Sequence, residues 1–437
     1  MNKKLDKFLQ QIIRILFYTF VFLLPWQTKL IIKPSDNNFT EISFFVSHII
    51  LLLLLMVFLL YRVIKKDYHS RSSVMWYSLA GLSLFAFLSF FFAPDKVLAF
   101  YMFIILMLGL GLFYFLQEGC KKFAYVDSVI EKSTTVFVFL TSIFFHVLLG
   151  IYQFLSQRAF AFKYLGLASH FPEDLGVSVI ETSSGRWLRA YGGFDHPNIF
   201  AGVLIIAIIL ATYYLAKKKA IRTKTETIES LFLFIFYFFS LLALLFTFSR
   251  SAWVAFIIAF ISLVILFIYK KDKWALGRLA ALFLFSIILI STIFFSYREL
   301  FMMRIEASGR LEQISLDERK DQLATVSKVL KEKWFFGVGL GNYTTYLKNS
   351  DFDRNGIKKA DWQYQPVHNS LFLLWVQSGL LALVFFITFL ITLWKKSREE
   401  AFVWFLLLPL ILLMFFDHWL LSLPFGVIFL FFILGIF

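Results

Sequence analysis

The stretch Gln365-Pro366-Val367-His368-Asn369-Ser370-Leu371 marks the point where a long polar segment meets an apolar one. The polar segment runs from about residue 297 to 367, and apolar residues dominate from about 369 to 394. Pro366 fixes its own backbone and ends the element before it, so a new helix is expected to begin near Asn369. The sequence therefore predicts a histidine at the mouth of a membrane helix, where His368 can exchange protons near neutral pH.

Composition places the whole chain in a membrane. Of its 437 residues 60% are hydrophobic and 16% are charged, and apolar runs of about 20 residues recur throughout. We therefore expect an all-α polytopic membrane protein. The net charge of +15 is explained by lysines and arginines that flank membrane helices, so no nucleic-acid partner is expected. A single cysteine, Cys120, excludes an internal disulfide framework and a cysteine-based metal site.

The apolar runs predict twelve transmembrane spans. Five spans fall in residues 1–156, four in 197–297 and three in 369–437, and two loops lie between them at 157–196 and 298–368. The eleventh span is short, so Asp417-His418 is expected either in a loop or in a re-entrant turn. The spans cover approximately residues 9–27, 42–61, 74–93, 97–116, 134–156, 197–216, 230–248, 251–269, 278–297, 369–394, 401–416 and 419–436.

Basic residues set the orientation. Six basic clusters fall on alternate connections, so with twelve spans they all lie on one side, which the positive-inside rule identifies as the cytoplasm. Both termini are then cytoplasmic and both long loops are outside, where nucleotide-activated substrates are absent. The clusters lie at residues 3–7, 62–71, 121–122, 217–224, 270–278 and 395–398.

The second outer loop contains a predicted amphipathic helix. Leu316, Arg319, Leu323, Val326 and Leu330 have the 3-4-3-4 spacing of one helical face, so this helix is expected to lie on the membrane or to cap the bundle. An arginine on such a face must find an anion or a carbonyl, or else extend to lipid headgroups or a neighbouring acid.

Three alternate glycines follow that helix. Gly337, Gly339 and Gly341 predict a tight turn or a close approach of the backbone to another element. They are no dinucleotide fingerprint, because no strand precedes them. In the same loop Asp351-Phe352-Asp353 resembles the two-aspartate motif of metal-dependent glycosyltransferases. Because those enzymes use nucleotide sugars, a solvated loop is the expected role here.

Two more stretches place polar residues at helix ends. Arg250 stands in the short turn Ser249-Arg250-Ser251 between two apolar helices, so its charge lies close to membrane depth. A phosphate could pair with this guanidinium in a bidentate way, and the alternative is an outward, solvated side chain. His196 precedes Pro197 at the start of the sixth span, which predicts a helix-capping role. His368 could likewise be a helix-start residue that headgroups satisfy.

The ordered set of these motifs resembles the O-antigen ligase and Wzy-type polymerase superfamily of bacterial envelope glycosyltransferases. The resemblance covers roughly residues 185 to 385, and the first five spans share only hydropathy with the family. The matching parts are Arg189-Ala-Tyr-Gly-Gly-Phe-Asp-His-Pro-Asn198, Ser249-Arg250-Ser251, Arg319 in its helix, Gly337-Val-Gly-Leu-Gly-Asn-Tyr343, and His368-Asn369-Ser-Leu371 with Gly379 downstream.

The resemblance implies an all-helical C-type glycosyltransferase fold in the cytoplasmic (inner) membrane, with the active site on the periplasmic face and with no metal or other cofactor. The donor would be a glycan on undecaprenyl diphosphate, and the transfer would invert the anomeric centre. In ligases, which act in lipopolysaccharide biosynthesis, the acceptor is lipid A-core. In Wzy-type O-antigen or capsule polymerases it is another lipid-linked repeat, and in protein O-oligosaccharyltransferases a side chain.

The resemblance also implies roles for individual residues. The catalytic residues would be His368, Arg250 and Arg319. The substrate-binding residues would be Arg189, Asn369, His196 and Gln377. Gln377 is a departure, because many relatives have a glutamate there. A lipid-linked glycan transporter and a membrane scaffold are the rival functions; no internal repeat supports the first, and the second does not need cations at membrane depth.

An impermeant thiol reagent can test the predicted orientation, because Cys120 is the one native cysteine to be replaced. We expect Ser350→Cys in the second outer loop to be labelled in intact cells, and Lys219→Cys to be protected. The opposite labelling pattern would reverse the topology.

Overall fold

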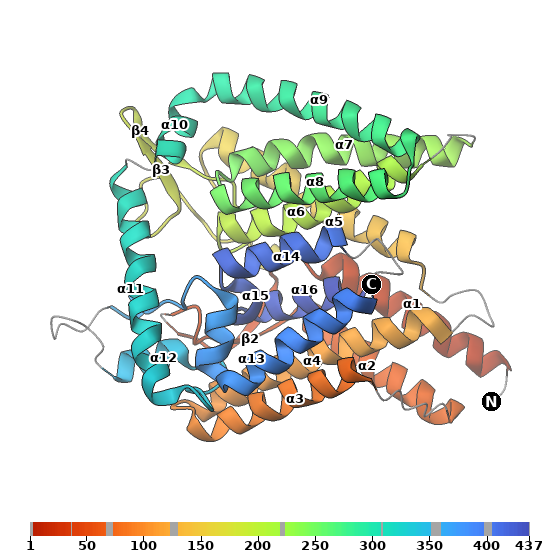
Figure 1. Ribbon diagram of the computed structural model, residues 1–437, viewed down its shortest axis with the longest axis vertical. Coiled ribbons are helices and arrows are strands. Elements are labelled where there is room, and N and C mark those ends of the chain that lie inside the picture. The colour runs from red at the N-terminus through yellow and green to blue at the C-terminus, as the bar shows by residue number, and fades with distance from the viewer. Residues whose placement is uncertain are drawn as a thin grey trace.

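A computed structural model describes residues 3–35, 37–66, 73–122, 130–218, 223–306, 309–350, 360–396 and 404–436 as a helical bundle with two small hairpins (Figure 1). Eleven of the twelve predicted spans each overlap one helix, and the twelfth, at 419–436, is divided between two short helices. The bundle helices are α1 (Lys3–Leu23), α2 (Val46–Lys65), α3 (Val74–Ser89), α4 (Lys96–Lys122), α5 (Lys132–Ser156), α6 (Pro197–Lys217), α7 (Lys224–Phe246), α8 (Arg250–Tyr269), α9 (Lys273–Ser296), α13 (Ser370–Lys396), α14 (Trp404–Phe416), α15 (Trp419–Ser422) and α16 (Pro424–Gly435).

Length and composition distinguish two groups among these helices. Within the described ranges, nine helices are long and apolar enough to cross a membrane, namely α2 to α9 and α13. Helices α14 and α16 are apolar but have only 13 and 12 residues. The expected span at 42–61 begins later than predicted, because residues 42–45 form a strand. The prediction of an all-α polytopic membrane protein is confirmed.

Helix α6 forms the centre of the bundle. In the most apolar part of α6, 89% of the residues are buried inside the protein. In the corresponding part of α9, at the periphery, 17% are buried. The apolar surface of α9 is therefore left for lipid, while α6 is covered by other helices on all sides. This arrangement makes α6 a rigid base for the residues at its N-terminus.

The connecting elements gather at one end of the bundle (Figure 1). Strands β1 (Lys29–Lys33) and β2 (Ile42–Phe45) form an antiparallel hairpin in which Lys29 pairs with Phe45. Strands β3 (Val179–Thr182) and β4 (Gly185–Leu188) form a second, joined by a two-residue turn. At the same end lie the long helix α11 (Arg310–Lys333) and the short helices α10 (Arg298–Glu306) and α12 (Tyr343–Asn349).

Helix α11 confirms the predicted amphipathic helix and runs across the end of the bundle (Figure 1). The face of α11 that packs on the bundle differs in part from the predicted apolar stripe. Val326 and Val329 are buried against the first turns of α13, whereas Leu316 and Leu323 are 39% and 49% exposed. These two leucines therefore do not cap the bundle, and their contact with the membrane surface stays a prediction. The helix instead turns Gln322 toward His368, where a hydrogen bond forms.

The segment after α11 packs into a break in α13. Gly379 has a φ of 84° and interrupts the helix, which frees backbone groups on both sides. The amide of Val338 donates to the Val376 carbonyl at 2.8 Å, and the amide of Gly339 donates to the Gln377 carbonyl at 2.9 Å. These bonds satisfy the polar groups that the break exposes inside the bundle.

The glycines make this close approach possible. Gly337, Gly339 and Gly341 all have positive φ values, between 73° and 99°. A Cβ on Gly337 would lie 2.5 Å from the Gln377 carbonyl carbon, and one on Gly339 would lie 2.4 Å from the Ala93 Cβ. The expectation of a close backbone approach is confirmed.

Gly379→Ala tests how far the fold depends on this break. A Cβ there would lie 1.8 Å from the Phe335 carbonyl oxygen, in a backbone conformation that alanine rarely adopts. We expect a loss of about 3 kcal/mol or more, seen as aggregation on size-exclusion chromatography or a much lower Tm in detergent. Gly277→Ala is the control, since nothing lies within 4 Å of its added Cβ. Equal Tm values for the two variants would contradict the role of the break.

Candidate functional site

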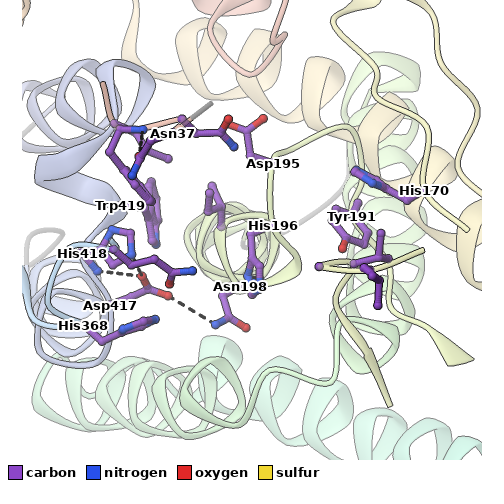
Figure 2. Close-up of a pocket in the computed structure, with 18 residues that line it drawn as sticks. Asn37, His170, Tyr191, Asp195, His196, Asn198, His368, Asp417, His418 and Trp419 are labelled. Carbon is purple, nitrogen blue, oxygen red and sulfur yellow. Dashed lines mark hydrogen bonds and ion pairs between the residues drawn. The ribbon is translucent and has the colours of Figure 1, made fainter. Parts of the chain in front are cut away.

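A cavity of about 900 Å³ lies where α6 and α13 begin (Figure 2). Its walls come from residues 37–39, 170–177, 191–199, 365–368 and 417–423. Among the described residues no lysine or arginine lines it, and no group of three histidine, cysteine or acidic side chains could hold a metal ion. Amides, carboxylates, imidazoles and aromatic rings make up the polar part of the wall: Asn37, Asn38, His170, Tyr191, Asp195, His196, Asn198, Gln365, His368, Asp417, His418 and Trp419.

His368 lies just before the first turn of α13 and lines the cavity. Its Nδ1 is 2.8 Å from Oε1 of Gln322 on α11, and its backbone amide donates to the same oxygen at 3.1 Å. Burial lowers the pKa of His368, the Asp417 carboxylate acts to raise it and the Arg319 charge lowers it further, with a net decrease. The imidazole is therefore mainly neutral at neutral pH.

Asp417 and His418 form the turn between α14 and α15. The amide and hydroxyl of Ser370 both donate to the Asp417 carbonyl, at 3.1 and 2.8 Å, which fixes the start of α13 to this turn. The rings of His418 and His368 meet edge to face, with centroids 5.1 Å apart. Burial acts to raise the pKa of Asp417, but electrostatic interactions with three neighbouring histidines and the hydrogen bond from the His418 amide lower it, with a net decrease. A carboxylate thus lies among imidazoles.

His196 confirms the predicted helix start. It is the N-cap of α6, where its Nδ1 accepts from the Asn198 amide at 3.1 Å and Pro197 occupies the first turn. Burial lowers the pKa of His196 to about 3, so the ring stays neutral and its Nδ1 remains an acceptor. Asn198 extends the network, because its Nδ2 lies 3.5 Å from Oδ2 of Asp417 (Figure 2).

Arg189 is buried behind this wall and does not line the cavity. Its Nη2 donates to Oδ1 of Asn198 at 2.8 Å, its Nη1 to the Ser178 hydroxyl at 2.7 Å and its Nε to the Thr247 carbonyl at 2.6 Å. These bonds join three outer segments around the start of α6. Arg189 is therefore placed to orient Asn198, and a contact with substrate stays a prediction.

Arg319 lies beside the cavity on α11. Its Nε is buried and has no hydrogen-bond partner among the described residues, and its charge acts on both His368 and His418. Arg250, at the first residue of α8, is half-buried and outside the cavity wall, and its Nη1 donates to the Arg304 carbonyl at 3.3 Å. The structure thus brings Arg319, but not Arg250, to the histidines.

Asn369 and Gln377 lie outside the cavity wall. The Asn369 Oδ1 accepts from the amides of Leu371 and Phe372, at 3.0 and 2.9 Å, so this residue caps α13. The Gln377 side chain faces a separate void of about 20 Å³ with largely apolar walls. The suggestion that Gln377 holds sugar hydroxyls gains no support from this position. Asp351 and Asp353 lie outside the described residues.

An N-terminal loop completes the cavity. Asn37 is buried and its Nδ2 donates to the carbonyls of Asp361 and Tyr364, each at 2.8 Å. This bond pair ties the β1–β2 hairpin to the chain that leads to His368. Sequence reasoning missed Asn37 and Gln322, because each acquires its partner only through tertiary contacts. Gln322 lies three residues after Arg319, so the sequence could have indicated that the two side chains share one face of the helix.

Comparison with known proteins places part of this site in a family. Residues 235–387, from within α7 to within α13, match the family model described as O-antigen ligase. The matched segment includes Arg250, Arg319 and His368. No curated protein and no solved structure matches the chain. Over these residues the chain is therefore similar to O-antigen ligases, which supports its place in the O-antigen ligase and Wzy-type polymerase superfamily.

Proposed function

We propose that this protein is an inverting membrane glycosyltransferase that moves a glycan from undecaprenyl diphosphate to an acceptor hydroxyl at the outer face of the cytoplasmic membrane. Lipid A-core is the proposed acceptor, which makes the protein an O-antigen ligase. The observation that carries the proposal is a neutral histidine on the wall of a polar cavity, at the start of a membrane helix in the family's domain.

The cavity suits sugars better than a diphosphate. Amide, carboxylate and imidazole groups can exchange hydrogen bonds with hydroxyls, and aromatic rings such as Trp419 offer apolar surface. Its volume falls within the usual range for small-molecule sites. Since the described wall has no lysine or arginine, we assign the sugar residues next to the reacting bond to this cavity.

The diphosphate is assigned to arginines outside the cavity wall. Arg319 presents a buried Nε that lacks a protein partner among the described residues, which favours binding of an anion from the ligand. A guanidinium fork can hold two phosphate oxygens and stabilise the charge that develops on the leaving group. Arg250 is the proposed second contact.

His368 is the proposed base. Its neutral imidazole takes the proton of the acceptor hydroxyl while the hydroxyl oxygen forms a bond to the anomeric carbon. The bond from that carbon to the diphosphate oxygen breaks on the opposite face, and undecaprenyl diphosphate leaves with the electron pair. The configuration at the anomeric carbon is thereby inverted. The Asp417 carboxylate is placed to stabilise the imidazolium that forms.

Transfer of a radiolabelled glycan from undecaprenyl diphosphate to purified lipid A-core, by the purified protein in detergent, tests the function. Product formation is expected. Product on a second lipid-linked repeat or on a protein, with none on lipid A-core, would assign the polymerase or the protein transferase instead. Failure with every acceptor, together with movement of the donor between leaflets of a vesicle, would assign a transporter.

His368→Ala is expected to reduce the transfer rate by about 10²- to 10⁴-fold or more, with normal insertion and donor binding. His196→Ala should do less, since that residue caps α6. Wild-type activity should fall as the pH falls through the pKa of His368, because a protonated imidazole cannot accept the hydroxyl proton. The midpoint of this fall in activity should lie below a pH of about 6.5, the usual histidine pKa, because burial lowers the pKa of His368. A fully active His368→Ala protein would exclude the role.

Arg250→Lys and Arg319→Lys should impair transfer nearly as much as the alanine variants, because lysine keeps the charge but lacks the bidentate fork. Arg310→Lys is the control on α11, since Arg310 is exposed and pairs with Glu181 at 3.0 Å. Transfer assays at saturating acceptor measure the effect. Full activity with lysine would mean that a point charge suffices or that the arginine only anchors the helix.

A further inference from the structure

Gln322 makes the hydrogen bonds that hold His368. The two residues are separated by 46 positions in the chain, so the docking of α11 on α13 brings them together. One side-chain oxygen of Gln322 lies 2.8 Å from Nδ1 and 3.1 Å from the amide nitrogen of His368. Two contacts from one atom fix both the ring and the backbone before α13.

These two contacts also fix the tautomer of the ring. A backbone amide can only donate, so the atom that it meets is the carbonyl oxygen of Gln322, not the amide nitrogen. A carbonyl oxygen can only accept, so Nδ1 of the neutral imidazole must carry the proton. Nε2 then has the free lone pair. The nitrogen that can act as a base is therefore the one not turned toward α11.

We propose that Gln322 is a positioning residue that holds His368 in its Nδ1–H tautomer, so that Nε2 faces the acceptor hydroxyl as the base. This inference rests on the proposed function of His368. The ionisable groups around the ring are Asp417 and His418 from the α14–α15 turn, His196 from the start of α6, and Arg319 from α11. Gln322 itself is uncharged, so it orients the ring without adding a charge of its own.

Two substitutions separate orientation from charge. Gln322→Leu removes the acceptor at similar size, and kcat is expected to fall at least about tenfold with KM near the wild-type value. Gln322→Glu keeps an acceptor for both N–H groups, so it should retain much of the transfer rate. Its carboxylate should raise the pKa of His368 and move the acid limb of the pH profile to higher pH. Gln313→Leu and Gln313→Glu are controls at an exposed glutamine of the same helix.

A second readout does not depend on transfer. Diethyl pyrocarbonate modifies neutral imidazole, so its rate at His368, measured by peptide mass spectrometry from pH 5 to 8, reports the pKa of that ring. Gln322→Glu should shift this rate profile to higher pH, while Gln313→Glu should not. If the wild type transfers no glycan but this shift occurs, the contact stands and the proposed function fails.

Other outcomes would overturn the inference. Unchanged kcat and pH profile in Gln322→Leu would show that His368 needs no orienting group. A modification profile of His368 that does not move in Gln322→Glu would show that the two side chains are not in contact. Size-exclusion chromatography and Tm accompany each variant, and the near-isosteric Gln322→Glu keeps the test decisive if Gln322→Leu fails to fold.

Discussion

The backbone pairing between residues 334–339 and the break in α13 is the constraint on which the site depends. A broken membrane helix leaves carbonyl and amide groups that lipid cannot satisfy, and here a second stretch of backbone satisfies them. That stretch is the continuation of α11, so the pairing also fixes where α11 lies. Arg319 and Gln322 are both on α11. The backbone hydrogen bonds at the break in α13 therefore also position these two residues near His368.

The cavity is built from helix ends. The N-caps of α6 and α13 are His196 and Asn369, and the turn before α15 contains Asp417. Helix starts leave backbone amides without partners, so polar side chains are needed there for folding alone. His196 and Asp417 line the cavity, whereas Asn369 caps α13 just outside its wall. In the proposed function, helix capping and sugar binding would both use polar groups of this kind.

Much of this fold follows from local sequence. Apolar runs predicted where the bundle helices lie, except that α15 and α16 were expected as one span. The alternate glycines predicted a close backbone approach, and the His-Pro-Asn sequence predicted the cap at His196. These features depend on residues within a few positions of one another. The described structure agrees with each of them.

The rest of the site depends on contacts between distant segments. The bond from Gln322 to His368 spans 46 positions, and that from Asn198 to Asp417 spans 219. Leu316 and Leu323 of α11 are exposed. Their exposure could not be predicted, because helical periodicity identifies an apolar stripe without identifying what packs on it. Gln377 was assigned to substrate from the resemblance, as the residue at the position of a glutamate in relatives, but it lines a separate void.

The burial of α6 separates membrane insertion from folding. The apolar sequence of α6 allows this helix to insert into lipid by itself. In the folded protein, nearly all of its apolar surface is covered by other helices. Substitutions that enlarge a side chain on α6 would leave insertion intact and fail only at the later packing stage. Since α6 carries His196 and Asn198 at its start, the cavity wall is completed by packing rather than by insertion.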